Sequence, residues 1–424
     1  MSALAKYFLS KNTEVWGYDS KKTATVDDLI DKGLKFLHPD DLSLGSALIV
    51  YTSAVENTLE FSSLKERGFE LIKRSELLSL VQGKYKLNFA VAGCHGKTTT
   101  TAMLAHVLIS ANLHPTAFIG GEDLILSNLV IGKRKVCVSE ACEYKGNFLD
   151  LRRDVAIITN IDNDHLDYYG DLDTLKKAFN TFALGNIAVI NSDDKNSTII
   201  SGRKTITFGI NNPADYIATD ITYTGGGVNF SVVHKGKKIK GFTIMVPCKH
   251  NVYNALAVIS ASRVKGVSWR AIKRGLASFT GVKRRNEYIG KVNGVSAYCD
   301  YAHHPTEIKN AISNITDKTV IVFQPHTYSR TATLFSEFLE TLKKVNNLIV
   351  YKTYPAREKY DRQGSAKTLF EELKGQRKSN LYYARSPSEI IKAISHMDKI
   401  DRVIFLGAGD VYEIAINLTD KKEN

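Results

Sequence analysis

The sequence has few of the features that mark membrane, secreted or zinc-binding proteins. None of its apolar runs approaches the length of a membrane span, and no basic-then-apolar leader precedes the first predicted helix. We therefore predict neither membrane insertion nor a signal peptide. The five cysteines, at positions 94, 137, 142, 248 and 299, are scattered and show no CxxC spacing. This usage is typical of reduced thiols in a cytoplasmic protein, not of disulfides or a zinc site.

Internal repeats and low-complexity tracts are also lacking, as is the interleaving of basic and aromatic residues that is typical of single-strand nucleic-acid binders. The net charge is +13, but Lys and Arg are spread along the chain with only short clusters such as "HKGKKIK". We therefore predict no nucleic-acid partner. The basic excess favours an anionic small substrate.

The composition is that of a globular protein of 424 residues, with 43% hydrophobic and 24% charged residues. This length predicts two or three domains. Strand-like and helix-like runs alternate, which predicts an α/β fold with largely parallel sheets. We expect three domains, at 1–83, 84–283 and 284–424. Between 215 and 246, alternating runs with "TGGG" and "HKG" turns predict an antiparallel patch beside the central parallel sheet.

The segment "GCHGKTTTT" follows an apolar strand and opens a helix, which is the context of a phosphate-binding loop. Gly93 and Gly96 allow backbone N–H groups to turn toward an anion at the helix N-terminus. Lys97 would reach the β- and γ-phosphates, and a hydroxyl of Thr98 or Thr99 would ligate magnesium. The loop is shorter than the common G-x4-G-K-[ST] form.

Acidic and histidine residues follow two further apolar strands, in "SEACE" and "TNIDNDHLD". Because strand ends of a parallel sheet converge beside such a loop, we expect these side chains near the nucleotide. Singly, each is typical of a helix cap, but two clusters after successive strands favour a metal site. The residues are Glu140, Glu143, Asp162, Asp164 and His165.

Two more groups of polar residues are candidates for binding. His250, Asn251 and Asn254 lie at the start of a predicted helix, where Asn251 could equally be an ordinary cap. In the third segment, "YCDYAHHPTEI" and "FQPHTYSRT" place polar residues at two strand ends, which suggests one site. An arginine there would bind a carboxylate through two hydrogen bonds.

These motifs together resemble the Mur ligase family, along the whole chain. The resemblance lies in "GCHGKTTTT", "EACEYKGNFL", "TNIDNDHLDYYG", "HNVYNALA", "FTGVKRR", "DYAHHPTEI" and "FQPHTYSRT". It implies an ATP- and Mg²⁺-dependent amide ligase of peptidoglycan precursor synthesis, from the branch that joins L-alanine to the carboxylate of UDP-N-acetylmuramate. The implied route passes through an acyl phosphate, and the implied domains hold the UDP-sugar, ATP and the amino acid in that order.

The resemblance also assigns residues to roles. The implied catalytic residues are Lys97, His165, Asp300, His303 and Arg330. Those implied around ATP are Gly93, Cys94, His95, Gly96, Lys97, Thr98, Thr99, His250, Asn251, Asn254, Arg284 and Asp300. The implied metal ligands are Thr98, Glu140 and His165. The implied contacts to the UDP-sugar and to alanine are Ser2, Asp19, Ser53, Tyr301, His303 and Arg330.

Three other functions are compatible with parts of this pattern. A murein peptide ligase would add a tripeptide to the same UDP-sugar, although "EACEYKGNFL" favours the alanine-adding branch. A P-loop kinase or GTPase would leave the His/Arg clusters of the third segment without a role. A binding protein with an inactive ATP site is disfavoured by Lys97, Glu140 and His165. The oligomeric state is not predicted.

The beginning of the chain reads as the second half of a nucleotide-binding βαβ unit, because a helix comes first and a strand ending at Asp19 follows. Relatives of the family have a strand and a G-x-G-G-x-G turn before that helix. We therefore expect the natural product to be longer by roughly 10–20 residues, one strand and a turn. True loss of the strand is the alternative. In either case the strands ending at Asp19 and Ser53 lack a neighbour between them.

Overall fold

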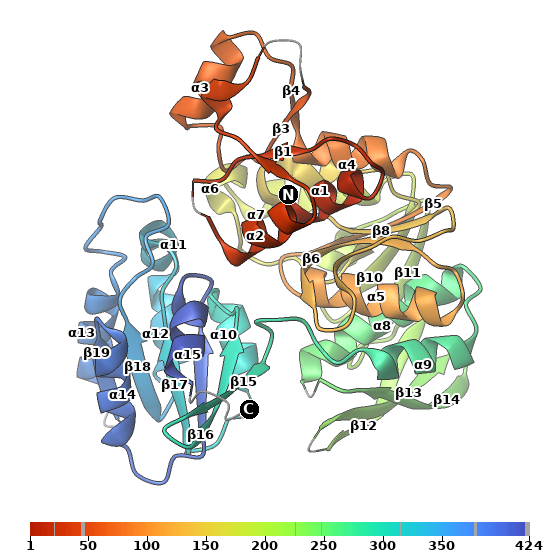
Figure 1. Ribbon diagram of the computed structural model, residues 1–424. Coiled ribbons are helices and arrows are strands. Elements are labelled where there is room, and N and C mark those ends of the chain that lie inside the picture. Colours follow the sequence, from red (N-terminus) through yellow and green to blue (C-terminus); the bar gives the residue numbers. More distant parts are fainter. Residues whose placement is uncertain are drawn as a thin grey trace. The chain divides into compact units, whose positions relative to one another are not determined.

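The protein is described by a computed structural model that covers residues 1–20, 22–43, 47–224, 226–246, 248–313, 315–376 and 380–419. The chain divides into two compact units, Met1–Gly281 and Val282–Asn424 (Figure 1). The predicted α/β class is confirmed, since helices and strands alternate in both units.

The first unit contains a mixed sheet of ten strands in the order β14-β13-β12-β11-β10-β9-β5-β8-β6-β7. Its middle is parallel and both of its edges are antiparallel. The strands are β5 (Leu87–Ala92), β6 (Thr116–Asp123), β7 (Ser127–Val130), β8 (Val136–Glu140), β9 (Val155–Ile158), β10 (Ile187–Asn191), β11 (Lys204–Gly209), β12 (Tyr216–Thr224), β13 (Gly227–His234) and β14 (Lys237–Ile244).

The central strands are apolar on both faces because helices cover both sides of the sheet. Ala90 and Ala92 face a cluster with Phe148 and Phe179, whereas α5, α8 and α9 pack together on the sheet and contact its strands. The helices of this unit are α1 (Ser2–Leu9), α2 (Ala24–Asp31), α3 (Leu59–Glu66), α4 (Arg74–Gln82), α5 (Lys97–Ser110), α6 (Leu166–Tyr169), α7 (Leu172–Ala183), α8 (Lys249–Val264) and α9 (Trp269–Ser278). The described residues of this unit also form the 3₁₀ helices η1 (Pro39–Asp41), η2 (Tyr144–Asp150) and η3 (Ser197–Ile199).

The predicted antiparallel patch is present as β12, β13 and β14, and it continues the parallel sheet because β12 pairs in parallel with β11. The opposite antiparallel edge, β6 with β7, was not predicted. Its "IGGED" segment lacks the continuous apolar run that marks the buried strands.

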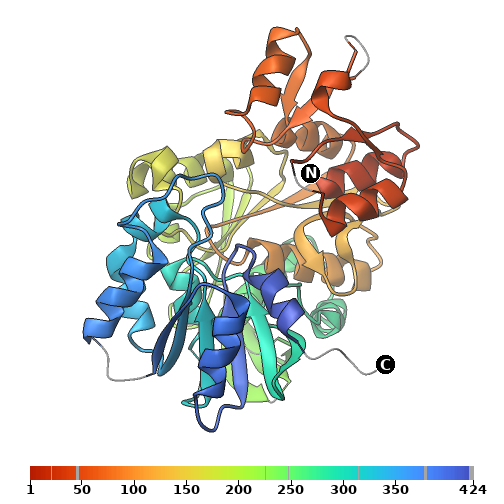
Figure 2. The ribbon, with the colours of Figure 1, turned by 60° about the vertical axis from the view of Figure 1, so that its left-hand side comes forward.

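The first 83 residues form two small sheets and pack on the central sheet. β1 (Trp16–Gly17) pairs with β2 (Lys35–Phe36), and β3 (Ile49–Tyr51) pairs with β4 (Leu71–Lys73). Within the described residues these pairs do not join into one sheet. Leu4 and Tyr7 of α1 belong to the same hydrophobic cluster as Phe118 of β6. Both ribbon views show the red N-terminal helices beside the orange edge of the central sheet (Figures 1 and 2).

The second unit is a six-stranded sheet in the order β15-β16-β20-β17-β18-β19, parallel except for β15. Alternate residues of its strands face two separate clusters, one with α14 and α15 and one with α10, α12 and α13. The strands are β15 (Glu287–Val292), β16 (Val295–Asp300), β17 (Thr319–Phe323), β18 (Asn347–Tyr351), β19 (Leu381–Ala384) and β20 (Arg402–Leu406). The helices are α10 (Pro305–Ala311), α11 (Tyr328–Thr333), α12 (Phe335–Leu342), α13 (Ala366–Gln376), α14 (Pro387–Ser395) and α15 (Val411–Leu418).

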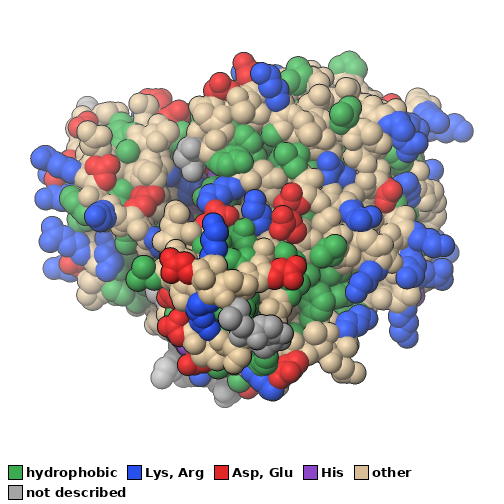
Figure 3. Space-filling view, turned by 90° about the horizontal axis from the view of Figure 1, so that it is seen from above, with side chains coloured by type: hydrophobic (Ala, Val, Ile, Leu, Met, Phe, Trp, Pro, Cys, Tyr) green, Lys and Arg blue, Asp and Glu red, His purple; other side chains and the backbone are tan. Residues whose placement is uncertain are grey.

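Among the described residues, no helix combines the length and the hydropathy that crossing a membrane requires. On the face drawn in Figure 3, lysine and arginine side chains are interspersed with acidic and apolar ones.

Candidate functional site

The loop between β5 and α5 has the backbone of a phosphate-binding loop. Gly93 and Gly96 have φ angles of +130° and +83°, which residues with a Cβ atom rarely adopt. A Cβ atom at Gly93 would lie 2.1 Å from Thr159 Oγ1, and one at Gly96 would lie 2.5 Å from Asn254 Oδ1. The positions therefore need glycine for space as well as for conformation. Helix α5 begins at Lys97, so the N–H groups of its first turn point toward this loop.

Lys97 lies over the loop and forms an ion pair with a buried glutamate. Its Nζ atom donates to the carbonyls of Gly93 (2.7 Å) and Cys94 (3.2 Å) and to Glu143 Oε1 (3.0 Å). Burial works against the charged lysine, but the negative charges of Glu143 and its neighbours outweigh burial and raise the Lys97 pKa. Lys97 is therefore a permanent cation at the place where phosphates bind a P-loop.

Glu140, at the end of β8, contacts the second residue of α5. Thr98 Oγ1 donates to Glu140 Oε2 at 2.7 Å. The carboxylate lies against Gly120 of β6, where a Cβ atom would be 2.0 Å from the same oxygen. Gly120 was not predicted as a site residue. The glycine pair in "IGGED" is its only sequence signal, and its partner cannot be read from the sequence.

Glu143, Asp164 and His165 bring three possible metal-binding atoms within 4.8 Å of one another. Glu143 is fully buried and its Oε2 atom has no hydrogen-bond partner among the described atoms. His165 Nε2 lies 3.8 Å from Glu143 Oε1 and 3.7 Å from Asp164 Oδ2. The structure thus groups His165 with Glu143, whereas the resemblance assigned it to a metal set with Thr98 and Glu140.

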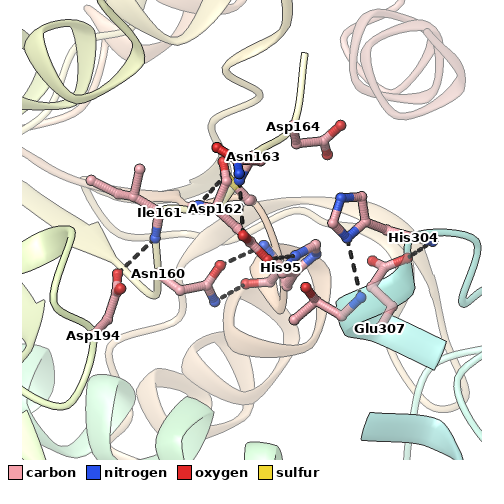
Figure 4. Close-up of polar contacts among 12 residues, drawn as sticks. His95, Asn160, Ile161, Asp162, Asn163, Asp164, Asp194, His304 and Glu307 are labelled. Atoms are coloured by element: carbon pink, nitrogen blue, oxygen red, sulfur yellow. Dashed lines mark hydrogen bonds and ion pairs between the residues drawn. The ribbon is translucent and has the colours of Figure 1, made fainter. Parts of the chain in front are cut away.

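The loop after β9 holds the phosphate loop in place (Figure 4). Asn160 Oδ1 accepts from the His95 N–H at 2.9 Å, and Asn160 Nδ2 donates to the His95 carbonyl at 2.9 Å. His95 Nε2 lies 3.2 Å from Asp162 Oδ2. Asp194 in turn accepts from the Ile161 N–H at 2.8 Å. Asn160 was not predicted, although it belongs to the "TNIDNDH" motif.

The start of α8 contacts the same loop through Asn254. Asn254 Nδ2 donates to Asn251 Oδ1 at 3.1 Å, and both side chains are buried. His250 Nδ1 lies 2.8 Å from Cys248 Sγ. Of the residues predicted around ATP, those of the loop and Asn254 are therefore brought together in this unit, and Thr99 is buried in the first turn of α5.

The three residues predicted for the UDP-sugar lie apart from one another along the first segment. Ser2 Oγ, at the start of α1, accepts from Asn128 Nδ2 at 2.8 Å. Ser53 follows β3, and its Oγ accepts from Asn147 Nδ2 at 3.3 Å. Asp19 follows β1 and is exposed. Ser2 and Ser53 thus contact different residues of the central part of the chain, Asn128 and Asn147.

In the second unit, Asp300 is the last residue of β16 and His303 lies in the loop that follows. Asp300 accepts from the N–H groups of Asn286 and Ala302, both at 2.8 Å, and burial raises its pKa. His303 Nδ1 lies 2.8 Å from the Tyr301 carbonyl, so this nitrogen carries the proton in the neutral ring and Nε2 is the acceptor. The Tyr301 ring packs under the guanidinium of Arg284 at 5.0 Å.

Arg330 lies in α11, which follows β17, and β20 separates this strand from β16 in the sheet. One of its guanidinium nitrogens donates to the His326 carbonyl at 2.9 Å. The His326 and His303 rings are 5.8 Å apart. Burial lowers the pKa of each histidine to about 4, and the Arg330 charge acts in the same direction. Both rings are therefore neutral at pH 7, and the positive charges near them are those of Arg330 and Arg284. In the same unit, His304 Nδ1 accepts from the Thr306 N–H at 3.3 Å (Figure 4).

The first unit is thus an α/β nucleotide-phosphate-binding domain by its fold and its loop. Three family domains match the chain, in order along the sequence. They are the Mur ligase family catalytic domain at residues 1–85, the Mur ligase middle domain at 91–262 and the Mur ligase glutamate ligase domain at 284–409.

Full-length relatives give the same result. A UDP-N-acetylmuramate–L-alanine ligase of Caldanaerobacter subterraneus subsp. tengcongensis is 38% identical over 98% of this chain and 94% of its own length. One of Aquifex aeolicus is 38% identical over 97% of this chain and 93% of its own. The structure is also similar to that of the UDP-N-acetylmuramate-alanine ligase of Thermotoga maritima, with a TM-score of 0.84, 27% identity and coverage of 99% and 95% of the two chains. The chain belongs to the Mur ligase family.

Proposed function

We propose that this protein is an ATP-dependent ligase that joins L-alanine to the carboxylate of UDP-N-acetylmuramate. The full-length similarity to ligases of that name carries the proposal. In this role it acts in the cytoplasm, in the peptidoglycan precursor synthesis on which cell wall biogenesis, cell shape and cell division depend.

The phosphate loop supports ATP as the energy source. Transfer of the γ-phosphate to the sugar carboxylate brings two anions together, so the site must supply positive charge. Lys97 supplies it as an ammonium group whose side chain is only 14% exposed. The products of this step are an acyl phosphate and ADP. Attack by the alanine amine on the acyl phosphate then expels inorganic phosphate. His250, Asn251 and Asn254 are proposed to contact the nucleoside.

A magnesium ion fits the residues around Lys97. Glu143 offers a buried carboxylate oxygen without a hydrogen-bond partner among the described atoms, and Asp164 and His165 lie within reach of the same point. Mg²⁺ commonly takes one or two carboxylates and completes its shell with phosphate oxygens and water. When bound, it would neutralise charge on the transferring phosphate. Thr98 and Glu140 remain proposed ligands of the same ion.

The strand ends of the second unit are proposed to bind alanine. Arg330 would hold its carboxylate through two hydrogen bonds. His303 is neutral at pH 7 and presents Nε2 as an acceptor, so it can orient the ammonium group and receive a proton from it. Tyr301 completes the proposed set of alanine contacts, whereas Arg284 and Asp300 are proposed to contact ATP.

Release of inorganic phosphate tests the proposal directly. With ATP, Mg²⁺ and UDP-N-acetylmuramate, we expect phosphate release that depends on L-alanine and matches formation of the alanyl product. Release that needs no amino acid would indicate an NTPase, and transfer to a hydroxyl would indicate a kinase. The need for a metal is tested by leaving Mg²⁺ out of the assay and then adding it back at increasing concentrations.

The alternative is a murein peptide ligase, which would accept a tripeptide in place of alanine. A structure of this name from Psychrobacter arcticus shares the fold, with a TM-score of 0.72 and 23% identity. Competition between L-alanine and the tripeptide for the same UDP-sugar separates the two functions. Preferential use of the tripeptide would overturn the proposal.

A further inference from the structure

Cys248 and His250 form a thiol–imidazole pair at the start of α8. Cys248 is the residue before the first turn of this 16-residue helix, and its Sγ atom lies 2.8 Å from His250 Nδ1. Both residues are half-buried, so solvent reaches them. We propose that Cys248 is a reactive thiol, and that its conversion to a mixed disulfide by a low-molecular-weight disulfide lowers nucleotide binding at the adjoining site.

The chemistry of the pair favours this step. A thiol within hydrogen-bond distance of an imidazole can pass its proton to that base, and the N–H groups at the N-terminus of a helix favour a negative charge. The Cys248 thiolate then attacks one sulfur of the disulfide. A new S–S bond joins Cys248 to one half, and the other half leaves as a thiolate that takes up a proton. Cys248 is oxidised, the released half is reduced, and no other reactant is needed.

The other four cysteines provide an internal contrast. Cys94, Cys137 and Cys299 are buried, and burial raises the pKa of each thiol above its ordinary value. Burial, together with the charge of Glu143, raises the pKa of the Cys142 thiol to about 11. These thiols are protonated at pH 7 and react slowly. We therefore expect modification at Cys248 alone.

A short path of contacts connects Cys248 to the phosphate loop. Its carbonyl accepts from the Asn251 N–H at 3.0 Å, and Asn251 Oδ1 accepts from Asn254 Nδ2 at 3.1 Å. Asn254 in turn lies directly against Gly96. An adduct on Cys248 removes the thiol proton that the His250 ring contacts, and we expect the added group to disturb this first turn of α8. The effect on ATP rests on the proposed function, whereas the reactivity of the thiol does not.

The test uses the full chain and hydroxyethyl disulfide as the probe. We expect mass spectrometry to find one adduct, on Cys248, that dithiothreitol removes. At ATP concentrations below KM, the ligase rate of the modified enzyme should be lower by a factor of about ten or more, because small displacements at a binding site are costly. The rate should return on reduction. Saturating ATP added beforehand should slow the labelling.

Two variants make the test specific. Cys248→Ser should keep its ligase rate, take up no adduct and resist the probe. His250→Gln should be labelled about five- to tenfold more slowly, since no imidazole takes the thiol proton. Labelling of another cysteine, an unchanged labelling rate in His250→Gln, or a fully active adduct would overturn the inference. Absence of ligase activity in the untreated protein would instead contradict the proposed function, and the adduct is read by mass in either case.

Discussion

At the scale of single residues, Glu143 depends on Lys97, because its carboxylate is fully buried and Lys97, with a side chain 14% exposed, is its ion-pair partner. Replacement of Lys97 by Met should lower kcat at least about 100-fold, through loss of charge beside the transferring phosphate. It also leaves Glu143 buried without its partner, which should cost about 3–5 kcal/mol in the free energy of unfolding. Steady-state kinetics and urea unfolding measure the two effects separately.

The double variant Lys97→Met with Glu143→Gln is the matched control for stability. Because it removes both charges of the pair, it should recover most of the lost unfolding free energy while turnover stays low. If turnover recovered together with stability, Lys97 would have a structural role only.

Arg330 gives a second prediction at this scale. Its replacement by Ala should weaken alanine binding by about 2–4 kcal/mol, seen as a raised KM for L-alanine. The KM for ATP should change little. A variant in which only the ATP constant moved would place Arg330 in a different role. The measurement is a pair of substrate titrations, each at saturation of the other substrates.

At the scale of elements, the close contact between β6 and β8 positions Glu140. Gly120→Ala places a Cβ atom 2.0 Å from the Glu140 carboxylate, so this side chain must move away from Thr98. We expect a clear loss of turnover with a smaller loss of stability. Gly375→Ala is the control, since a Cβ atom there meets nothing within 4 Å in an exposed part of α13. It should stabilise the helix by about 0.5–1 kcal/mol.

The ends of β16 and β17 predict a pH dependence. His303 and His326 have pKa values of about 4 in the folded protein against 6.5 when unfolded. Between these values the unfolded chain binds more protons, so stability is full above pH 6.5 and falls as the pH drops toward 4. Hydrogen exchange of the β17 amides should report this loss.

His326→Gln isolates the contribution of one ring. This variant should lose less stability between pH 7 and pH 5. The slope of its unfolding free energy against pH should be smaller by the equivalent of about one bound proton. Asp300, whose raised pKa acts in the opposite direction, is present in both proteins and cancels in the comparison. Equal slopes would show that the His326 ring is not held neutral by burial.

The elements that the sequence predicted are those with a continuous apolar run next to a turn signal, such as β5, β8, β9 and β17. Short or half-exposed strands such as β2, β15 and β19 carry no such run and were missed. For the site, strand ends could be located from the sequence, but not which carboxylate lies beside which cation. The pairing of Lys97 with Glu143, and of Thr98 with Glu140, depends on the register between β5 and β8.

At the scale of the whole molecule, the predicted division at 84 runs through a continuous packing unit. The first 83 residues share a hydrophobic cluster with the central sheet, and both belong to the unit Met1–Gly281. A sequence shows where apolar residues recur, but not that Tyr7 packs on Phe118, because the two are far apart along the chain. The two boundaries between the three predicted domains therefore stay a prediction.

The order of strands in the central sheet has a consequence for synthesis on the ribosome. β5 pairs with β8 and β9, which follow it only at residues 136–140 and 155–158. At translation rates of about 5–20 residues per second, Leu87–Ala92 waits several seconds for its neighbours. During that interval it is an apolar strand with two open edges, the kind of segment that chaperones bind and that aggregates when unprotected. The phosphate loop acquires its shape only after β9 has emerged, so nucleotide cannot assist the first steps of folding.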